Sequence, residues 1–245
     1  MKSNKKQVSL AAIYRKYGIL LILVLLFIVS ALINKNFLKP QNLINILKQI
    51  SVVTIIACGE TMLIVSGMID LSAGLVCTMC ACFSAGVLAS TGSIPLTFVT
   101  GIGMGMASGW INGFLITRYK LQPFIATLAM TNIAQGITQI YTNGQAVSGV
   151  EKIRFLGQGS VLGIPMPVIV MLAAVAVIAC LMKFTTLGVR IYAIGGNEKA
   201  TIASGINVNR SKRVIFTISG ALVGLAGIVL MARLMSGYFG DQVSQ

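Results

Sequence analysis

Histidine is absent from the chain, and acidic residues are scarce, with five Asp and Glu among 245 residues. Histidine is the commonest metal ligand and the usual general base, and the few carboxylates form no pair at close helical spacing. No phosphate loop of the pattern Gly-x-x-x-x-Gly-Lys-Ser/Thr occurs either. We therefore expect no enzyme, no cofactor, no metal ion and no ATP hydrolysis by the chain itself.

Charge is also sparse. Charged residues make up 10% of the chain and hydrophobic residues 56%, whereas soluble domains carry roughly a quarter charged residues. Several apolar runs approach or exceed the ~20 residues needed to cross a bilayer as a helix. The alternating ten-residue segments of a membrane β-barrel are absent. The sequence predicts an all-α fold, a polytopic transmembrane helix bundle.

The apolar runs predict about seven spans: residues 18–33, 43–66, 75–90, 96–117, 121–141, 161–182 and 214–235. Pro40 is expected to break any helix in the loop 34–42. No small-residue cleavage site follows the first run, so it should be retained as an anchor. An inside N-terminus places most of the nineteen Lys and Arg on the cytoplasmic side.

This topology divides the chain into a cytoplasmic tail (1–17), a transmembrane domain (18–235) with a cytoplasmic loop at 184–213, and an external end (236–245). Tyr238 and Phe239 should lie at the outer membrane boundary. The net charge of +14 does not indicate nucleic acid, because the basic residues cluster at loop ends and follow topology. The expected surrounding partner is the lipid bilayer.

Two spacing patterns favour packing. Cys77-x-x-Cys80-x-Cys82 has a metal-like spacing, but small apolar packing residues are the favoured interpretation, since the chain has no histidine. Glycine recurs every four residues at Gly101, Gly105, Gly109 and Gly113, and again as Gly220-x-x-x-Gly224. Such a bare face lets another membrane helix approach closely.

A polar interruption, GMIDLSAG at 67–74, follows the second span. Asp70 is suited to cap the next helix, and broken helices at membrane depth often form transporter sites. Glu60, a carboxylate inside a span, either lines a substrate pathway or is simply hydrogen-bonded near the inner end. Two roles for Asp70 remain open, capping of the next helix and direct contact with the substrate. By capping the helix, Asp70 would also help to form a substrate site.

The fifth span is polar for a membrane helix. The predicted substrate pathway comprises polar residues of three segments: Glu60, Asp70, Ser72, Thr127, Thr131, Asn132 and Gln135. Such groups either line a hydrophilic path or hold helices together, at roughly 0.6–2 kcal/mol each.

The loop 184–213 is strongly basic and contains signals for a short helix. Asn197 can cap the N-terminus of this helix, and the negative charge of Glu198 is favourable at the same, positive end of the helix dipole. Gly205 can adopt the left-handed conformation that often ends a helix. An ordinary positive-inside loop is the alternative interpretation.

Both segments resemble the permease subunits of ATP-binding cassette importers for ribose and related sugars. In the loop, the matching residues are Gly188, Ala193, Ile194, Gly195, Asn197, Ala200, Ser204, Gly205 and Ile206, while Thr201 replaces an alanine. In GMIDLSAG the Ile69–Ser72 centre and Gly74 match, whereas Met68 and Ala73 differ. PFIATL at 123–128 also matches, but Gln135-Gly136 replaces an Arg-Gly pair.

The resemblance implies import of a ribose-like monosaccharide across the bacterial inner membrane by alternating access. It also implies three partners: an ABC ATPase subunit, an extracytoplasmic sugar-binding protein and a second permease copy. The ATPase would dock on the loop, through Gly195, Asn197, Glu198, Lys199, Ala200, Ser204 and Gly205. Family members continue for two or three more spans, so we expect a truncated chain. The alternative function is an ion-gradient-driven transporter with Glu60 or Asp70 as the coupling carboxylate.

Overall fold

The computed structural model describes residues 10–237, and the named elements of this part of the chain are helices apart from one short hairpin. The elements in chain order are α1 (Leu10–Ile33), α2 (Pro40–Val65), α3 (Ala73–Thr91), α4 (Ile94–Arg118), α5 (Pro123–Thr142), η1 (Glu151–Ile153), α6 (Arg154–Gln158), β1 (Ser160–Val161), β2 (Ile164–Pro165), α7 (Met166–Phe184), α8 (Thr186–Gly196), α9 (Glu198–Ala203) and α10 (Val208–Leu234). The predicted all-α class is confirmed. The predicted positions of residues 1–9 and of Tyr238 and Phe239 lie outside the described range.

Five of the described helices are long and apolar enough to cross a membrane, namely α2, α3, α4, α7 and α10. Each of the seven predicted spans coincides with a helix, but α1 has only a shorter apolar stretch, Gly18–Ile33, in its searched part. α5 is not among the five, because threonine, asparagine and glutamine side chains interrupt its apolar sequence. The count of seven spans therefore stays a prediction.

Two helix starts differ from the sequence-based expectation. Pro40 does not break a helix but begins α2, because proline fits the first turn, where no helical N–H bond is needed. The sixth predicted span begins at Met166 instead of residue 161, because the preceding residues form the hairpin β1–β2. Leu162 and Gly163 make its two-residue turn, both with positive φ, as tight hairpins require.

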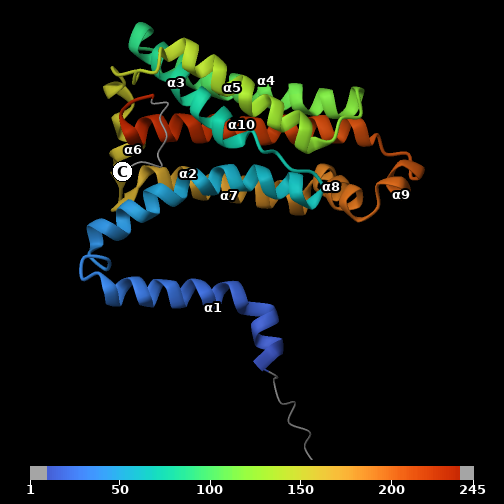
Figure 1. Cartoon of the computed structure of the whole chain (residues 1–245), viewed down its shortest axis with the longest axis horizontal. Coiled ribbons are helices and arrows are strands. Elements are labelled where there is room, and N and C mark those ends of the chain that lie inside the picture. The colour runs from blue at the N-terminus through green and yellow to red at the C-terminus, as the bar shows by residue number, and fades with distance from the viewer. Residues whose placement is uncertain (1–9, 238–245) are drawn as a thin grey trace, which may run out of the picture. The chain divides into compact units, whose positions relative to one another are not determined.

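The chain forms two compact units, residues 1–47 and 48–245. In the first, the ring of Phe27 packs edge-on against Phe37 with centroids 5.0 Å apart. In the second, α10 packs most extensively against α4 and then against α3 (Figure 1). Its core includes fully buried side chains such as Ile55, Cys80 and Val229. Cys77 and Cys80 belong to this cluster, which supports their packing role.

The glycine face of α4 packs in close contact with the backbone of α10. A β-carbon added at Gly105 would lie 2.9 Å from the Cα of Gly224, and one at Gly113 would lie 2.9 Å from the Cα of Arg213. In return, a β-carbon at Gly220 would meet the carbonyl group of Gly105, and one at Gly224 would meet that of Gly101. The two backbones run antiparallel, since earlier residues of α4 meet later residues of α10. The predicted packing role of both glycine patterns is confirmed.

The basic segment after α7 is more ordered than the expected loop. α8 was not predicted, and α10 begins at Val208, so Arg210, Lys212 and Arg213 lie in its first turns. The Asn207 side chain accepts a hydrogen bond from the Arg210 amide at 2.9 Å and caps this start. The span predicted to begin at residue 214 thus extends as a helix into the basic cluster.

Candidate functional site

The segment between α2 and α3 is an irregular stretch that carries buried polar groups. Gly67 adopts a positive φ of 76°, and the Met68 amide donates to the Leu63 carbonyl at 2.9 Å, which ends α2. Asp70 is 8% exposed and Ser72 only 1% exposed. In a membrane, such backbone is stable only where protein or a hydrated cavity surrounds it.

Asp70 fixes the conformation of this segment. Its Oδ1 accepts hydrogen bonds from the Ser72 amide at 2.8 Å and from the Ser72 hydroxyl at 2.5 Å. The expectation that Asp70 caps α3 is wrong in detail, because the N-cap residue is Ser72 and the Asp70 bond reaches only that residue. The side chain of Ser72 makes no capping bond, so no side chain among residues 10–237 is seen to cap the first turn of α3.

Asn112 of α4 completes this buried group. It is 0% exposed, and its Nδ2 donates to the Ser72 hydroxyl at 3.1 Å. Its Oδ1 is buried without a partner among the described residues. Asn112 is not among the predicted pathway residues, although an amide within the glycine-rich span was a detectable signal.

Glu60 of α2 faces the same segment. Its Oε2 accepts from the Asp70 amide at 3.4 Å, while its Oε1 is buried and has no partner among the described residues. The carboxylate is half-buried. Glu60 therefore presents an acceptor that the described residues leave unused.

Two threonines of α5 hold the segment from the other side. The Leu71 amide donates to Thr127 Oγ1 at 3.2 Å, and Thr131 Oγ1 donates to the Leu71 carbonyl at 3.2 Å. Five predicted pathway residues are thus brought together: Glu60, Asp70, Ser72, Thr127 and Thr131. The other two do not join them: Asn132 is exposed and bonds to Leu128 of its own helix, and Gln135 makes no hydrogen bond to the group within the described range.

The second candidate region is α9. Asn197 caps it as predicted, with Oδ1 accepting from the Ala200 amide at 3.0 Å. Ser204 follows the helix as its C-cap residue, and Gly205 then adopts a φ of 80°. Lys199 and Ala200 are exposed on its surface. The predicted short capped helix is confirmed, and its surface is open.

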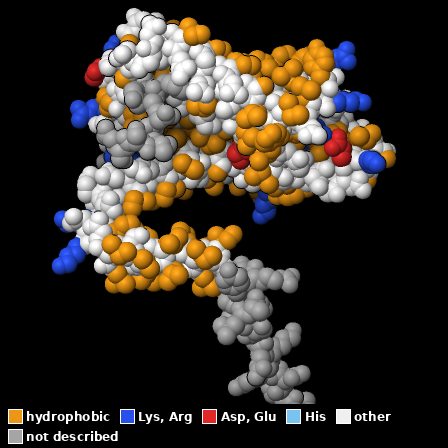
Figure 2. Space-filling model, in the orientation of Figure 1, with side chains coloured by type: hydrophobic (Ala, Val, Ile, Leu, Met, Phe, Trp, Pro, Cys, Tyr) orange, Lys and Arg blue, Asp and Glu red, His pale blue; other side chains and the backbone are white. Residues whose placement is uncertain are grey.

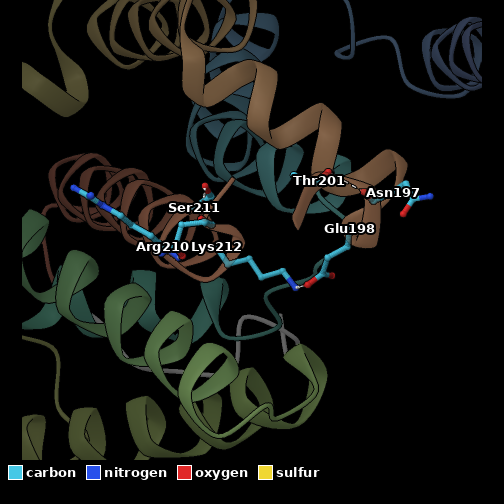
Figure 3. Close-up of polar contacts among 7 residues, drawn as sticks. Asn197, Glu198, Thr201, Arg210, Ser211 and Lys212 are labelled. Atoms are coloured by element: carbon cyan, nitrogen blue, oxygen red, sulfur yellow. Dashed lines mark hydrogen bonds and ion pairs between the residues drawn. The ribbon is translucent and has the colours of Figure 1, made fainter. Parts of the chain in front are cut away.

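An ion pair ties α9 to α10. Glu198 Oε1 lies 2.8 Å from Lys212 Nζ, as Figure 3 shows. Because the Glu198 side chain is 46% exposed, the pair contributes at most about 1 kcal/mol. Its effect is to orient α9 against the start of α10.

Gly195 places α8 directly against the end of α2. A β-carbon there would lie 2.9 Å from the carbonyl carbon of Val65 and 3.3 Å from the Cα of Ser66. The adjacent Gly196 has nothing within 4 Å of the same position. The predicted coupling residue Gly195 therefore touches α2 immediately before the irregular segment that carries Asp70.

Comparisons with known proteins give one consistent family. The pattern of the family described as "Branched-chain amino acid transport system / permease component" matches residues 42–244. The Ribose import permease protein RbsC of Bacillus subtilis is 38% identical over 96% of this chain and 74% of its own length. The Escherichia coli protein of the same name is 36% identical over 96% of this chain and 74% of its own length.

A further relative is named for a different sugar. The L-arabinose transport system permease protein AraH of Escherichia coli is 34% identical over 95% of this chain and 71% of its own length. No solved structure matches the chain.

The permease relatives favour a component of a transport system over a gradient-driven transporter or an enzyme. A permease component acts with the other components of its system, and its apolar helices make it a multi-pass membrane protein. The chain thus belongs to the family of branched-chain amino acid transport system permease components.

Proposed function

We propose that the chain is the permease subunit of an ATP-binding cassette importer that moves a ribose-like monosaccharide across the cytoplasmic membrane by alternating access. The observation that carries the proposal is its 38% identity to a ribose import permease over 96% of its length. The arrangement of α8, α9 and the α2–α3 segment supplies a physical route for the mechanism.

The pathway would run beside the α2–α3 segment. A sugar offers many hydroxyl groups, which donate and accept hydrogen bonds. Within the described part of the chain, Oε1 of Glu60 is an acceptor without a partner and no side chain caps the first turn of α3, which therefore offers backbone N–H donors. Asp70, Ser72, Thr127 and Thr131 would hold the backbone of this segment in place, as their hydrogen bonds to it support.

The coupling surface would be α9, which exposes Lys199 and Ala200. A push on α9 from a closing ATPase would move α8, and α8 meets the end of α2 at Gly195. The movement would thus reach the segment carrying Asp70 through direct packing. A bias of a few kcal/mol between two packings is sufficient for alternating access.

This proposal fixes an orientation. Residues 1–17 would be cytoplasmic, 18–235 would form the permease domain with the coupling segment 184–213, and 236–245 would be outside. The ATPase would bind from the cytoplasm, a sugar-binding protein would deliver substrate from outside, and a second permease copy would complete the transmembrane unit. The basic residues around α9 support this side as cytoplasmic (Figure 2).

The test is uptake of labelled ribose by proteoliposomes that contain the chain, an importer ATPase and a sugar-binding protein. We expect uptake to require ATP and to be insensitive to a protonophore. Ribose uptake that proceeds without the ATPase and stops with the protonophore would contradict the proposal.

Two adjacent glycines supply a matched pair for the coupling route. Gly195→Ala places a methyl group against the Val65 carbonyl and should reduce uptake at least tenfold, with ATP hydrolysis retained. Gly196→Ala meets open space and should leave uptake unchanged. Equal uptake by both variants would show that the α8–α2 contact does not transmit the movement.

A further inference from the structure

Trp110 of α4 and the first turns of α10 line an open pocket of about 350 Å³ that the proposed transport mechanism does not use. Its lining consists of two arginines, one aromatic ring and three smaller side chains: Trp110, Arg210, Arg213, Val214, Thr217 and Ile218. The arginines lie one turn apart on α10, so both reach the same face of the helix. The pocket combines a cationic rim with an apolar wall.

Both arginines are available to an anion. The neighbouring Lys212 forms an ion pair with Glu198, whereas neither Arg210 nor Arg213 has an acidic partner within the described range. The side-chain bond of Arg213 runs from Nε to the Asn209 carbonyl at 3.4 Å, which leaves its terminal amino groups free in the described part of the chain. In Figure 3 the Arg210 side chain points away from the Glu198–Lys212 pair.

The remaining walls suit an acyl chain. Trp110 is 50% exposed and stacks on Phe114 with centroids 5.4 Å apart. Gly113 of α4 meets Arg213, so Trp110 lies about one turn further from the arginine end. Tryptophan favours the headgroup level of a membrane, and guanidinium groups bind phosphate through paired hydrogen bonds. The pocket therefore places its charged residues at one end and its apolar residues at the other, in the same order as the headgroup and the acyl chain of a phospholipid.

We propose that this pocket binds one anionic phospholipid, with its phosphate between Arg210 and Arg213 and its acyl chain against Trp110 and Ile218. The headgroup would hold the start of α10 at the membrane surface, next to the helix that carries Lys212. Basic pockets between transmembrane helices are known to select anionic headgroups. The inference adds a bound lipid to the proposed transport cycle and does not depend on which solute is carried.

Native mass spectrometry of the detergent-purified full chain tests this proposal by titration with phosphatidylglycerol and phosphatidylcholine. We expect one phosphatidylglycerol to bind in preference to phosphatidylcholine. Each basic residue near an anionic headgroup strengthens binding roughly fivefold. The double variant Arg210→Gln/Arg213→Gln should therefore bind phosphatidylglycerol roughly 25-fold more weakly.

The matched control is Arg190→Gln/Lys199→Gln, which removes the same charge from α8 and α9, outside the pocket. It should retain wild-type lipid binding, and equal loss in both double variants would overturn the proposal as a general charge effect. Thermal unfolding checks that the pocket variant folds. Trp110→Ala should also weaken phosphatidylglycerol binding. Unchanged lipid binding in Trp110→Ala, together with full displacement by excess inorganic phosphate, would identify a free-phosphate site and overturn the lipid assignment.

Discussion

Asp70 acts on its surroundings chiefly as a hydrogen-bond acceptor. Asp70→Ala leaves the amide and hydroxyl of Ser72 buried without that acceptor, at about 1–3 kcal/mol for each unsatisfied group. We expect a lower free energy of unfolding and strongly impaired uptake. Thermal unfolding in detergent and transport in proteoliposomes measure the two effects.

Asp70→Asn is the matched variant, because its carbonyl oxygen keeps an acceptor while the charge is lost. It should restore most of the stability, and its uptake then separates the structural role from a need for charge at the pathway. Unchanged stability and uptake in Asp70→Ala would remove Asp70 from both roles.

Gly105 and Gly103 lie on the same helix in opposite environments. Gly105→Ala forces a methyl group into the backbone of Gly220 and Gly224 and should destabilise the protein by about 1–3 kcal/mol. Gly103→Ala meets open space and should be neutral or stabilise α4 by up to about 1 kcal/mol. Unfolding of the two purified variants provides the comparison, and equal melting temperatures would show that the glycine contact is not tight.

At the scale of an element, the conformation of α9 depends on the glycine that follows its C-terminal end. Gly205 has a φ of 80°, and its amide donates to the Ile202 carbonyl at 2.9 Å. Proline fixes φ near −65° and has no N–H, so Gly205→Pro should distort the end of α9 and abolish transport while the protein remains in the membrane.

Gly205→Asn is its graded control, since asparagine tolerates the left-handed conformation better than other side chains do. It should keep a large part of the uptake. Membrane levels from immunoblots normalise both rates. Wild-type uptake by the proline variant would refute the coupling role of α9.

Local signals decided which elements were predictable. α9 was found because Asn197 and Gly205 mark its two ends in the sequence. α8 was missed because Gly195 and Gly196 weaken its helix propensity, and contact with α2 supports it instead. The start of α10 was missed because the cap at Asn207 precedes a polar first turn. The pairing of Ser72 with Asn112 joins distant segments, and no local pattern encodes it.

For the whole molecule, the inside N-terminus is a prediction that labelling can test. In a variant without the five native cysteines, Lys152→Cys and Lys199→Cys mark opposite ends of the helix bundle. We expect a membrane-impermeant maleimide to label Cys at position 152 in intact spheroplasts and at position 199 only after permeabilisation. The reverse pattern would invert the proposed topology and move α9 away from any ATPase.

Composition and glycine spacing were sufficient to predict the architecture, but not its pairings. The four-residue repeat of Gly101 to Gly113 indicated one bare helix face, while its partner α10 emerged only from the fold. Apolarity predicted membrane helices, yet the polar residues of α5 leave its status as a span to experiment. Sequence patterns specify a surface, whereas the choice of its partner depends on the shapes of all the other helices.

The contact between α4 and α10 has a consequence for movement. Where two backbones meet with only hydrogen atoms between them, neither helix has room to slide or roll, because any shift drives a carbonyl of one into the other. We therefore expect α4 and α10 to travel as a single stiff lever. Opening and closing would then fall to the irregular segment between α2 and α3 and to α5, which would move relative to this pair of helices.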